Sequence, residues 1–87
     1  MNKYESVIIV NPNLDEAGLK ALEEKFTGLI NENGKVESVE NIGKKRLAYE
    51  IKKFKEGTYM IFSFEANPDS IKELERVYRI TDDVIKF

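Results

Sequence analysis

The sequence predicts an α+β domain in which two helices pack on one face of a four-stranded antiparallel sheet. Three observations support this prediction. Strand-like and helix-like segments follow one another as β-α-β-β-α-β within 87 residues. Apolar residues recur at helical spacing in two of these segments, and they alternate or run continuously in the other four. Turn residues rich in Asn, Pro and Gly separate most of the segments.

The first strand and the first helix are predicted from residues 4–34. Residues 4–10 are rich in β-branched and aromatic side chains, and Asn11-Pro12-Asn13 ends this strand. Asn13 with Glu16 three residues later resembles a capping box. The apolar face of the following helix comprises Leu19, Leu22, Phe26, Leu29 and Ile30. We expect Asn33-Gly34 to end the helix, with a positive φ at the glycine.

The next strand, over residues 36–51, changes its apolar register midway. Apolar residues stand at positions 36, 39 and 42 and then alternate strictly at 47, 49 and 51. Because the two registers disagree on either side of Gly43, we expect a β-bulge at this glycine.

The second half predicts a strand, a helix and a final strand. Lys55-Glu56-Gly57 is a predicted turn, and residues 58–64 form an almost continuously apolar strand. Asn67-Pro68-Asp69 predicts a helix start, because Asn can cap, Pro suits the first helical position and Asp faces the positive end of the dipole. Residues 84–87 are the last strand. This order is that of the ferredoxin-like sandwich, and right-handed crossovers place both helices on one face of its sheet.

The opposite face of the sheet is left without helices. Both faces of the presumed central strands are apolar, whereas a half-solvated sheet normally alternates apolar with polar residues. We therefore expect exposed apolar surface, which usually indicates a protein partner. The alternative is that loops and long basic side chains cover it. The partner-binding residues are expected to be either Tyr59 with Ile61 or Met60 with Phe62.

Positive charge is concentrated in one segment of an acidic chain. Residues 41–55 carry a net charge of +5, against −7 for the remaining 72 residues. Such a basic segment indicates contact with a polyanion such as nucleic acid. The predicted contact residues are Lys44, Lys45, Arg46, Lys52, Lys53 and Lys55. The alternative is a solvated strand edge whose lysines block sheet-to-sheet aggregation.

The stretch GKKRLAYEIK, residues 43–52, resembles the signature of the family of ribosomal protein six of the bacterial small subunit. KYESVIIVNPNL, KEGTYMIFSFEA and RITDDVIKF are similar to that family's first, third and last strands. The resemblance implies a cytoplasmic structural protein of the ribosome. It would bind the central domain of 16S ribosomal RNA as a heterodimer with ribosomal protein eighteen of the small subunit.

The resemblance implies RNA contact for the four cations of the matched signature, Lys44, Lys45, Arg46 and Lys52. For Lys53 and Lys55, RNA contact is predicted from charge and proximity alone. Family members commonly continue with a charged tail, so we expect residues 1–87 to be a single ferredoxin-like domain without that tail.

A weaker basic site is predicted near the chain ends. The last strand is expected to lie antiparallel beside the first, which would bring Lys3, Tyr4 and Lys86 into a corner able to contact phosphate or stack a base. The alternative is two ordinary terminal lysines and a half-buried tyrosine. Tyr49 is expected to be a core residue rather than a stacking platform.

No catalytic constellation is recognised. Without His or Cys, the chain lacks the commonest general base, the commonest zinc ligand and any thiolate. Its paired acids are adjacent in sequence and stand with no base. We predict no enzyme activity, metal, cofactor or small-molecule substrate, and no apolar run is long enough for a membrane span.

Two other functional classes share this topology. An RNA-recognition motif would be a stand-alone RNA-binding module, and Gly57, Tyr59 and Phe62 follow its order loosely. However, the glycine lacks the required flanks and the first strand lacks the required aromatic. A small-molecule-sensing regulatory domain is the second alternative. An acylphosphatase-like enzyme is disfavoured, because Asn11-Pro12-Asn13 offers no arginine for a phosphate loop.

Overall fold

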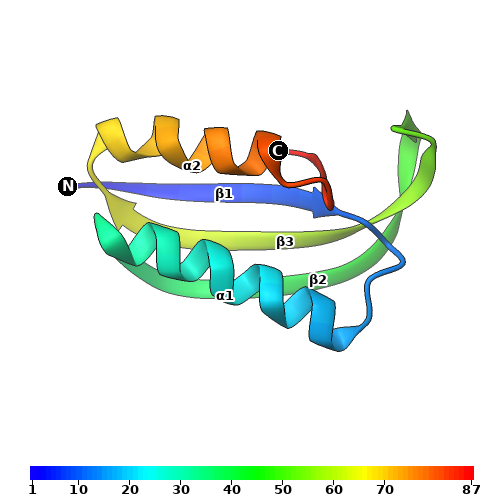
Figure 1. Ribbon diagram of the computed structural model, residues 1–87, viewed down its shortest axis with the longest axis horizontal. Helices are drawn as coiled ribbons and strands as arrows, with labels where there is room; N and C mark the ends of the chain where they lie inside the picture. The colour runs from blue at the N-terminus through cyan, green and yellow to red at the C-terminus, as the bar shows by residue number, and fades with distance from the viewer.

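The computed structural model describes residues 1–87 and confirms the predicted β-α-β-β-α-β order. The four strands form one antiparallel sheet in the order β2-β3-β1-β4, and both helices lie on one side of it (Figure 1). The elements are β1 (Asn2–Val10), α1 (Glu16–Glu32), β2 (Gly34–Ile51), β3 (Phe54–Ala66), α2 (Pro68–Ile80) and β4 (Val84–Lys86). Neither helix combines the length and apolarity needed to cross a bilayer.

The main core lies between the sheet and the helices. Phe26 on α1 sits edge-on to Tyr78 of α2, with 4.8 Å between ring centroids, and to Phe62 of β3 at 6.1 Å. Edge-to-face contacts of this kind add to the stabilisation from apolar burial. The sheet contributes Ile8, Val10, Met60, Phe62, Phe64, Ala66 and Val84, and the helices contribute Leu22, Phe26, Ile30, Leu74 and Tyr78.

The core decides which sheet face is left bare. Met60 and Phe62 are only 2% and 0% exposed and pack beneath the helices, so of the two predicted alternatives the one in which this pair contacts a partner is wrong. Successive strand residues point to opposite faces. Tyr59 and Ile61 therefore lie on the helix-free side, which we call the open face.

Tyr78 links the helix layer to the first strand through a polar contact inside the core. Its hydroxyl lies 3.0 Å from the Ser6 hydroxyl, and its ring is almost fully buried. Burial raises the pKa of Tyr78, and the hydrogen bond with Ser6 offsets part of that rise. The buried phenol is thus satisfied in its neutral form.

The first helix begins and ends differently from the prediction. Asp15 is its N-cap, and the carboxylate accepts a hydrogen bond from the Gly18 N–H at 2.8 Å. Asn13 instead belongs to the preceding turn, where its N–H donates to the side chain of Asn11. At the other end, Asn33 is the C-cap with φ −131°, and Gly34 begins β2 without a positive φ.

The second helix begins where the sequence predicts, at Pro68. Asn67 precedes it but makes no capping bond with its side chain. The backbone carbonyl of Asn67 instead accepts from the N–H and the hydroxyl of Ser70, at 3.0 and 2.7 Å.

The bulge predicted in β2 is confirmed at Gly43. The register with β3 shifts between Asn41 and Gly43, which leaves Ile42 as the extra residue. Gly43 has φ +101°, and its N–H donates to the Asn41 side chain at 3.0 Å. An added Cβ would meet nothing within 4 Å, so the demand for glycine here is purely conformational.

The turn between β2 and β3 lies at Lys52-Lys53, so the prediction of a turn at Lys55-Glu56-Gly57 is wrong. Both lysines have positive φ, 48° and 70°, and Ile51 pairs with Phe54 across them. A two-residue loop with positive φ twice is the type I′ geometry that matches strand twist. Gly57 lies within β3, where the absence of a side chain lets Ile9 pack directly over the backbone.

The predicted corner of Lys3, Tyr4 and Lys86 does not form. β4 is only three residues long and pairs with β1 at Ile9 and Val10 alone, so Lys86 lies opposite Ile9. Lys3 is six residues further along the strand, a distance of about 20 Å at ~3.3 Å per residue.

Candidate nucleic-acid interface

Residues 41–55 are here named the basic hairpin. This segment extends past the end of β1 and bends out of the direction in which the two helices run (Figure 1). All six of the segment's cations are exposed. The two ion pairs of the structure lie elsewhere, between Lys3 and Glu37 and between Glu73 and Arg76. The hairpin's positive charge is therefore not neutralised within the chain.

The three consecutive cations point to alternating sides of the hairpin. Lys44 lies opposite the buried Thr58, whereas Lys45 lies opposite Gly57, on the open-face side. Arg46 lies opposite Glu56 but forms no ion pair with it. Since successive strand residues alternate, the run makes a basic edge with charge on both sides rather than a patch on one face.

A second apolar cluster fixes the hairpin to the rest of the domain. Leu47 on the hairpin is buried against Ile9 of β1 and Ile85 of β4. Half-buried apolar residues pack around these three, namely Ile51, Phe54 and Tyr59. The hairpin thus covers one end of the open face with its own side chains. At this end the chain does cover its own apolar surface, but with apolar residues of the hairpin rather than with the expected loops and long basic side chains.

A smaller bare strip remains in the middle of the open face. Val7 is 43% exposed and lies directly opposite Ile61, which is half-buried. The neighbouring positions on the same face are polar, including Glu5 and Glu40. The exposed apolar surface is therefore a narrow strip bordered by acids, not a whole face.

Tyr49 is exposed, and the prediction that it is a core residue is wrong. Its side chain is 63% exposed, and Lys86 Nζ donates to its hydroxyl at 3.0 Å. The same ammonium lies 5.4 Å from the ring centroid, within the range of a cation–π contact. The hydrogen bond to Tyr49 raises the pKa of Lys86.

The structure therefore divides the two terminal lysines between different surfaces. Lys86 joins the basic hairpin through Tyr49, while Lys3 lies 3.9 Å from Glu37 at the opposite end of the sheet. Lys52 also approaches β4, with its ammonium 3.4 Å from the Val84 carbonyl. The sequence did not predict that Tyr49, Lys52 and β4 lie close together, because this depends on how far the hairpin bends and on where β4 pairs with β1.

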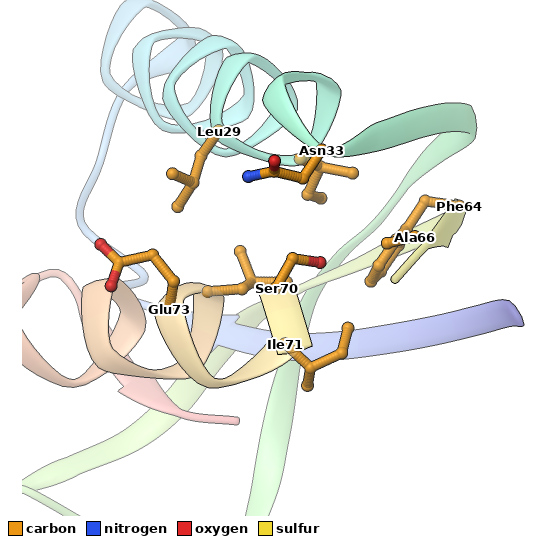
Figure 2. Close-up of a pocket in the computed structure, with 9 residues that line it drawn as sticks. Leu29, Asn33, Phe64, Ala66, Ser70, Ile71 and Glu73 are labelled. Atoms are coloured by element: carbon orange, nitrogen blue, oxygen red, sulfur yellow. The ribbon is translucent and has the colours of Figure 1, made fainter. Parts of the chain in front are cut away.

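The cleft between the two helices is too small for a ligand. Leu29 of α1 and the C-cap residue Asn33 face Ser70 and Glu73 of α2 across it (Figure 2). Its volume is about 20 Å³, room for about one water molecule. No group of three or more acidic, His or Cys side chains is placed to hold a metal ion.

Comparison with known proteins places this architecture among ribosomal components. A family model described as "Ribosomal protein S6" matches residues 3–87. The chain is 53% identical to "Small ribosomal subunit protein bS6" of Clostridium kluyveri, over 99% of this chain and 92% of that protein. It is 54% identical to the protein of that name from Clostridium botulinum strain Hall, over 99% and 93%.

A solved structure agrees with these sequence matches. The crystal structure of 30S ribosomal protein S6 from Thermotoga maritima superposes with a TM-score of 0.90 at 40% identity. The match covers 97% of this chain and 80% of that one.

Proposed function

The chain belongs to the ribosomal protein S6 family, and we propose that it binds the central domain of 16S ribosomal RNA as a heterodimer with ribosomal protein eighteen of the small subunit. At the level of the family, the chain is a structural, non-enzymatic component of the bacterial small ribosomal subunit in the cytoplasm.

The observation that supports RNA binding is the unneutralised charge of the basic hairpin. Six exposed cations on one projecting element can displace counterions from phosphates, which is the main source of affinity in protein–nucleic acid complexes. Phosphate contacts also fix a protein's register and orientation on its target. The proposed phosphate-contacting residues are Lys44, Lys45, Arg46, Lys52, Lys53 and Lys55, with Lys86 beside them.

Arg46 has a distinct role among these cations. Its planar guanidinium can bind a phosphate through two parallel hydrogen bonds, whereas each lysine acts as a flexible point charge. Lys3 is left out of the proposed surface, because it lies at the far end of the sheet beside Glu37.

The bare strip of the open face is the proposed docking surface for ribosomal protein eighteen. Val7 and Ile61 form its centre, and Tyr59 connects it to the hairpin's apolar cluster. Burying apolar surface contributes about 25 cal/mol per Å², although ordering and association offset much of that gain. The bordering acids, Glu5 and Glu40, suit a basic partner.

The test is RNA affinity measured with and without ribosomal protein eighteen at one fixed salt concentration. We expect weak binding by the isolated protein and much tighter binding with the partner present, because two basic surfaces then act together. Val7→Glu on the open face should remove this enhancement while leaving the fold intact.

The matched control is Ile80→Glu. Ile80 is a 61% exposed aliphatic residue at the end of α2, away from the open face, and its replacement should leave the enhancement unchanged. Equal RNA affinity with and without the partner would contradict the heterodimer and would favour a stand-alone RNA-binding module instead.

A further inference from the structure

Tyr49 is an exposed aromatic ring held between anchored neighbours. Leu47 and Ile51, two positions away on either side, pack into the apolar cluster on the open face. Tyr49 belongs to the same alternating series but leaves 63% of its surface in contact with solvent. The anchored flanks restrain the backbone at Tyr49 without covering its ring.

Lys86 restrains the ring from a second element. Its ammonium donates to the Tyr49 hydroxyl at 3.0 Å and lies 5.4 Å from the ring centroid. A ring whose orientation is already restrained loses less conformational entropy when a ligand binds to it. The arrangement therefore keeps an aromatic surface available in the middle of the basic hairpin.

Tyr49 also lines a shallow hollow, together with the apolar Leu47 and Ala48 and three charged residues. Arg46, Glu50 and Lys55 border this hollow, which has a volume of about 230 Å³. The two cations attract phosphate. The carboxylate of Glu50 repels phosphate but can accept a hydrogen bond from the exocyclic amine of a base. This mixture of charges suits a nucleobase inside the hollow with its phosphates at the rim.

From this geometry we infer that Tyr49 stacks one unpaired nucleobase of RNA, while Arg46 and Lys55 hold the flanking phosphates. Unpaired bases that leave their helix commonly stack on protein aromatic rings. Glu50 favours adenine, cytosine or guanine over uracil, since uracil has no exocyclic amine. The inference rests on the proposed RNA-binding function and adds to it a base contact that phosphate binding alone does not require.

The test compares the wild type, Tyr49→Phe, Tyr49→Leu and Tyr49→Ala for binding to a 16S central-domain fragment with ribosomal protein eighteen present. Tyr49→Phe keeps the ring and should bind within about twofold of the wild type, because stacking needs only a π-face. Tyr49→Leu and Tyr49→Ala should lose roughly 5- to 150-fold in affinity, the range spanned by base–aromatic stacking. The salt dependence should not change, since no phosphate contact is removed.

Tyr49→Leu distinguishes base stacking from a simple apolar contact, because leucine keeps an apolar side chain but has no aromatic ring. Unfolding midpoints of all variants confirm that each is folded. Wild-type affinity in Tyr49→Leu or Tyr49→Ala would overturn the stacking inference and leave the proposed function standing, provided that the hairpin's cations still set the salt dependence. Absence of RNA binding by the wild type with its partner would overturn the proposed function, and this inference with it.

Discussion

The helix-covered face of the sheet and the basic hairpin differ in where their side chains make contacts. Beneath the helices, buried side chains such as Phe26, Phe62 and Tyr78 make all their contacts within the domain. On the hairpin, six cations find no opposite charge within the chain, and Tyr49 is exposed. The first region supplies stability, and the second offers contacts that only another molecule can complete. Substitutions in the two regions should therefore affect different measurements.

The largest expected effect on stability is at the centre of the helix-covered face. Phe62 is 0% exposed, so Phe62→Ala should lower the free energy of unfolding by about 3–5 kcal/mol through lost burial and a residual cavity. Urea denaturation monitored by circular dichroism gives this value. Lys45→Ala on the hairpin is the contrasting variant and should leave the midpoint unchanged. Similar midpoints for the two variants would show that the hairpin contributes to stability as the helix-covered face does.

The next largest effect on stability comes from the backbone conformation of Gly43, where the hairpin begins. Gly43 has φ +101° with open space around it, so Gly43→Ala should lower the free energy of unfolding by about 1–2 kcal/mol through backbone strain alone. Gly28 in α1 has similarly open space but helical geometry. Gly28→Ala should therefore raise the free energy of unfolding by about 0.5–1 kcal/mol. Changes of the same sign at both positions would rule out the bulge geometry.

A smaller, pH-dependent effect concerns Tyr78. Tyr78→Phe removes the hydrogen bond to Ser6 and should lower the free energy of unfolding by about 1 kcal/mol at pH 7. Burial raises the pKa of Tyr78 in the folded state. Above the ordinary tyrosine pKa of about 10, the unfolded chain releases this proton while the folded chain retains it, so wild-type stability falls as pH rises.

Tyr78→Phe lacks that contribution, and the difference between the two proteins should shrink above pH 10. Chemical denaturation at pH 7, 9 and 10.5 measures it. A difference that grows with alkaline pH would contradict the assignment of a raised pKa to this residue.

The sequence predicted the fold well because apolar spacing and strong turn residues carry the information. The helical stripe from Leu19 to Ile30 and the Asn67-Pro68-Asp69 start both appear in the structure at the expected places. The Gly43 bulge was predictable too, since a glycine stood where two apolar registers disagreed. These features are local, and each depends on only a few neighbouring residues.

The hairpin geometry was less predictable because its turn has no turn-forming sequence. Lys52 and Lys53 both adopt positive φ, where Asn or Gly is usual, so the glycine at position 57 was misread as the turn. That shift carried residues 54–57 into β3. The exposure of Tyr49 and its contact with Lys86 follow from the resulting curl and from the short β4. Such contacts depend on long-range pairing that spacing in the sequence does not encode.

The basic character of the hairpin was evident from composition, but composition did not show whether its cations are free to bind another molecule. Only the structure shows that none of its six cations is engaged in an ion pair and that they point to both sides of the strand. On the open face, by contrast, the chain itself covers part of the surface that the sequence predicted to be exposed. Sequence alternation predicted exposed apolar surface on this face, and the hairpin's own Leu47 and Phe54 limit it to a strip around Val7.

Phosphate contact by the basic hairpin is tested most directly by the salt dependence of RNA binding with ribosomal protein eighteen present. Wild type is compared with the Lys44→Ala, Lys45→Ala, Arg46→Ala triple variant on a 16S central-domain fragment at several salt concentrations. A matched control replaces three exposed lysines outside the hairpin, Lys20, Lys35 and Lys72, by Ala.

If the hairpin contacts phosphates, its triple variant should bind more weakly. The slope of log affinity against log salt should fall by about two to three, of order one for each phosphate contact removed. The control variant carries the same change in net charge and should keep the wild-type slope. Identical slopes for the wild type and a folded hairpin variant would contradict the account and reduce the hairpin to a solvated strand edge.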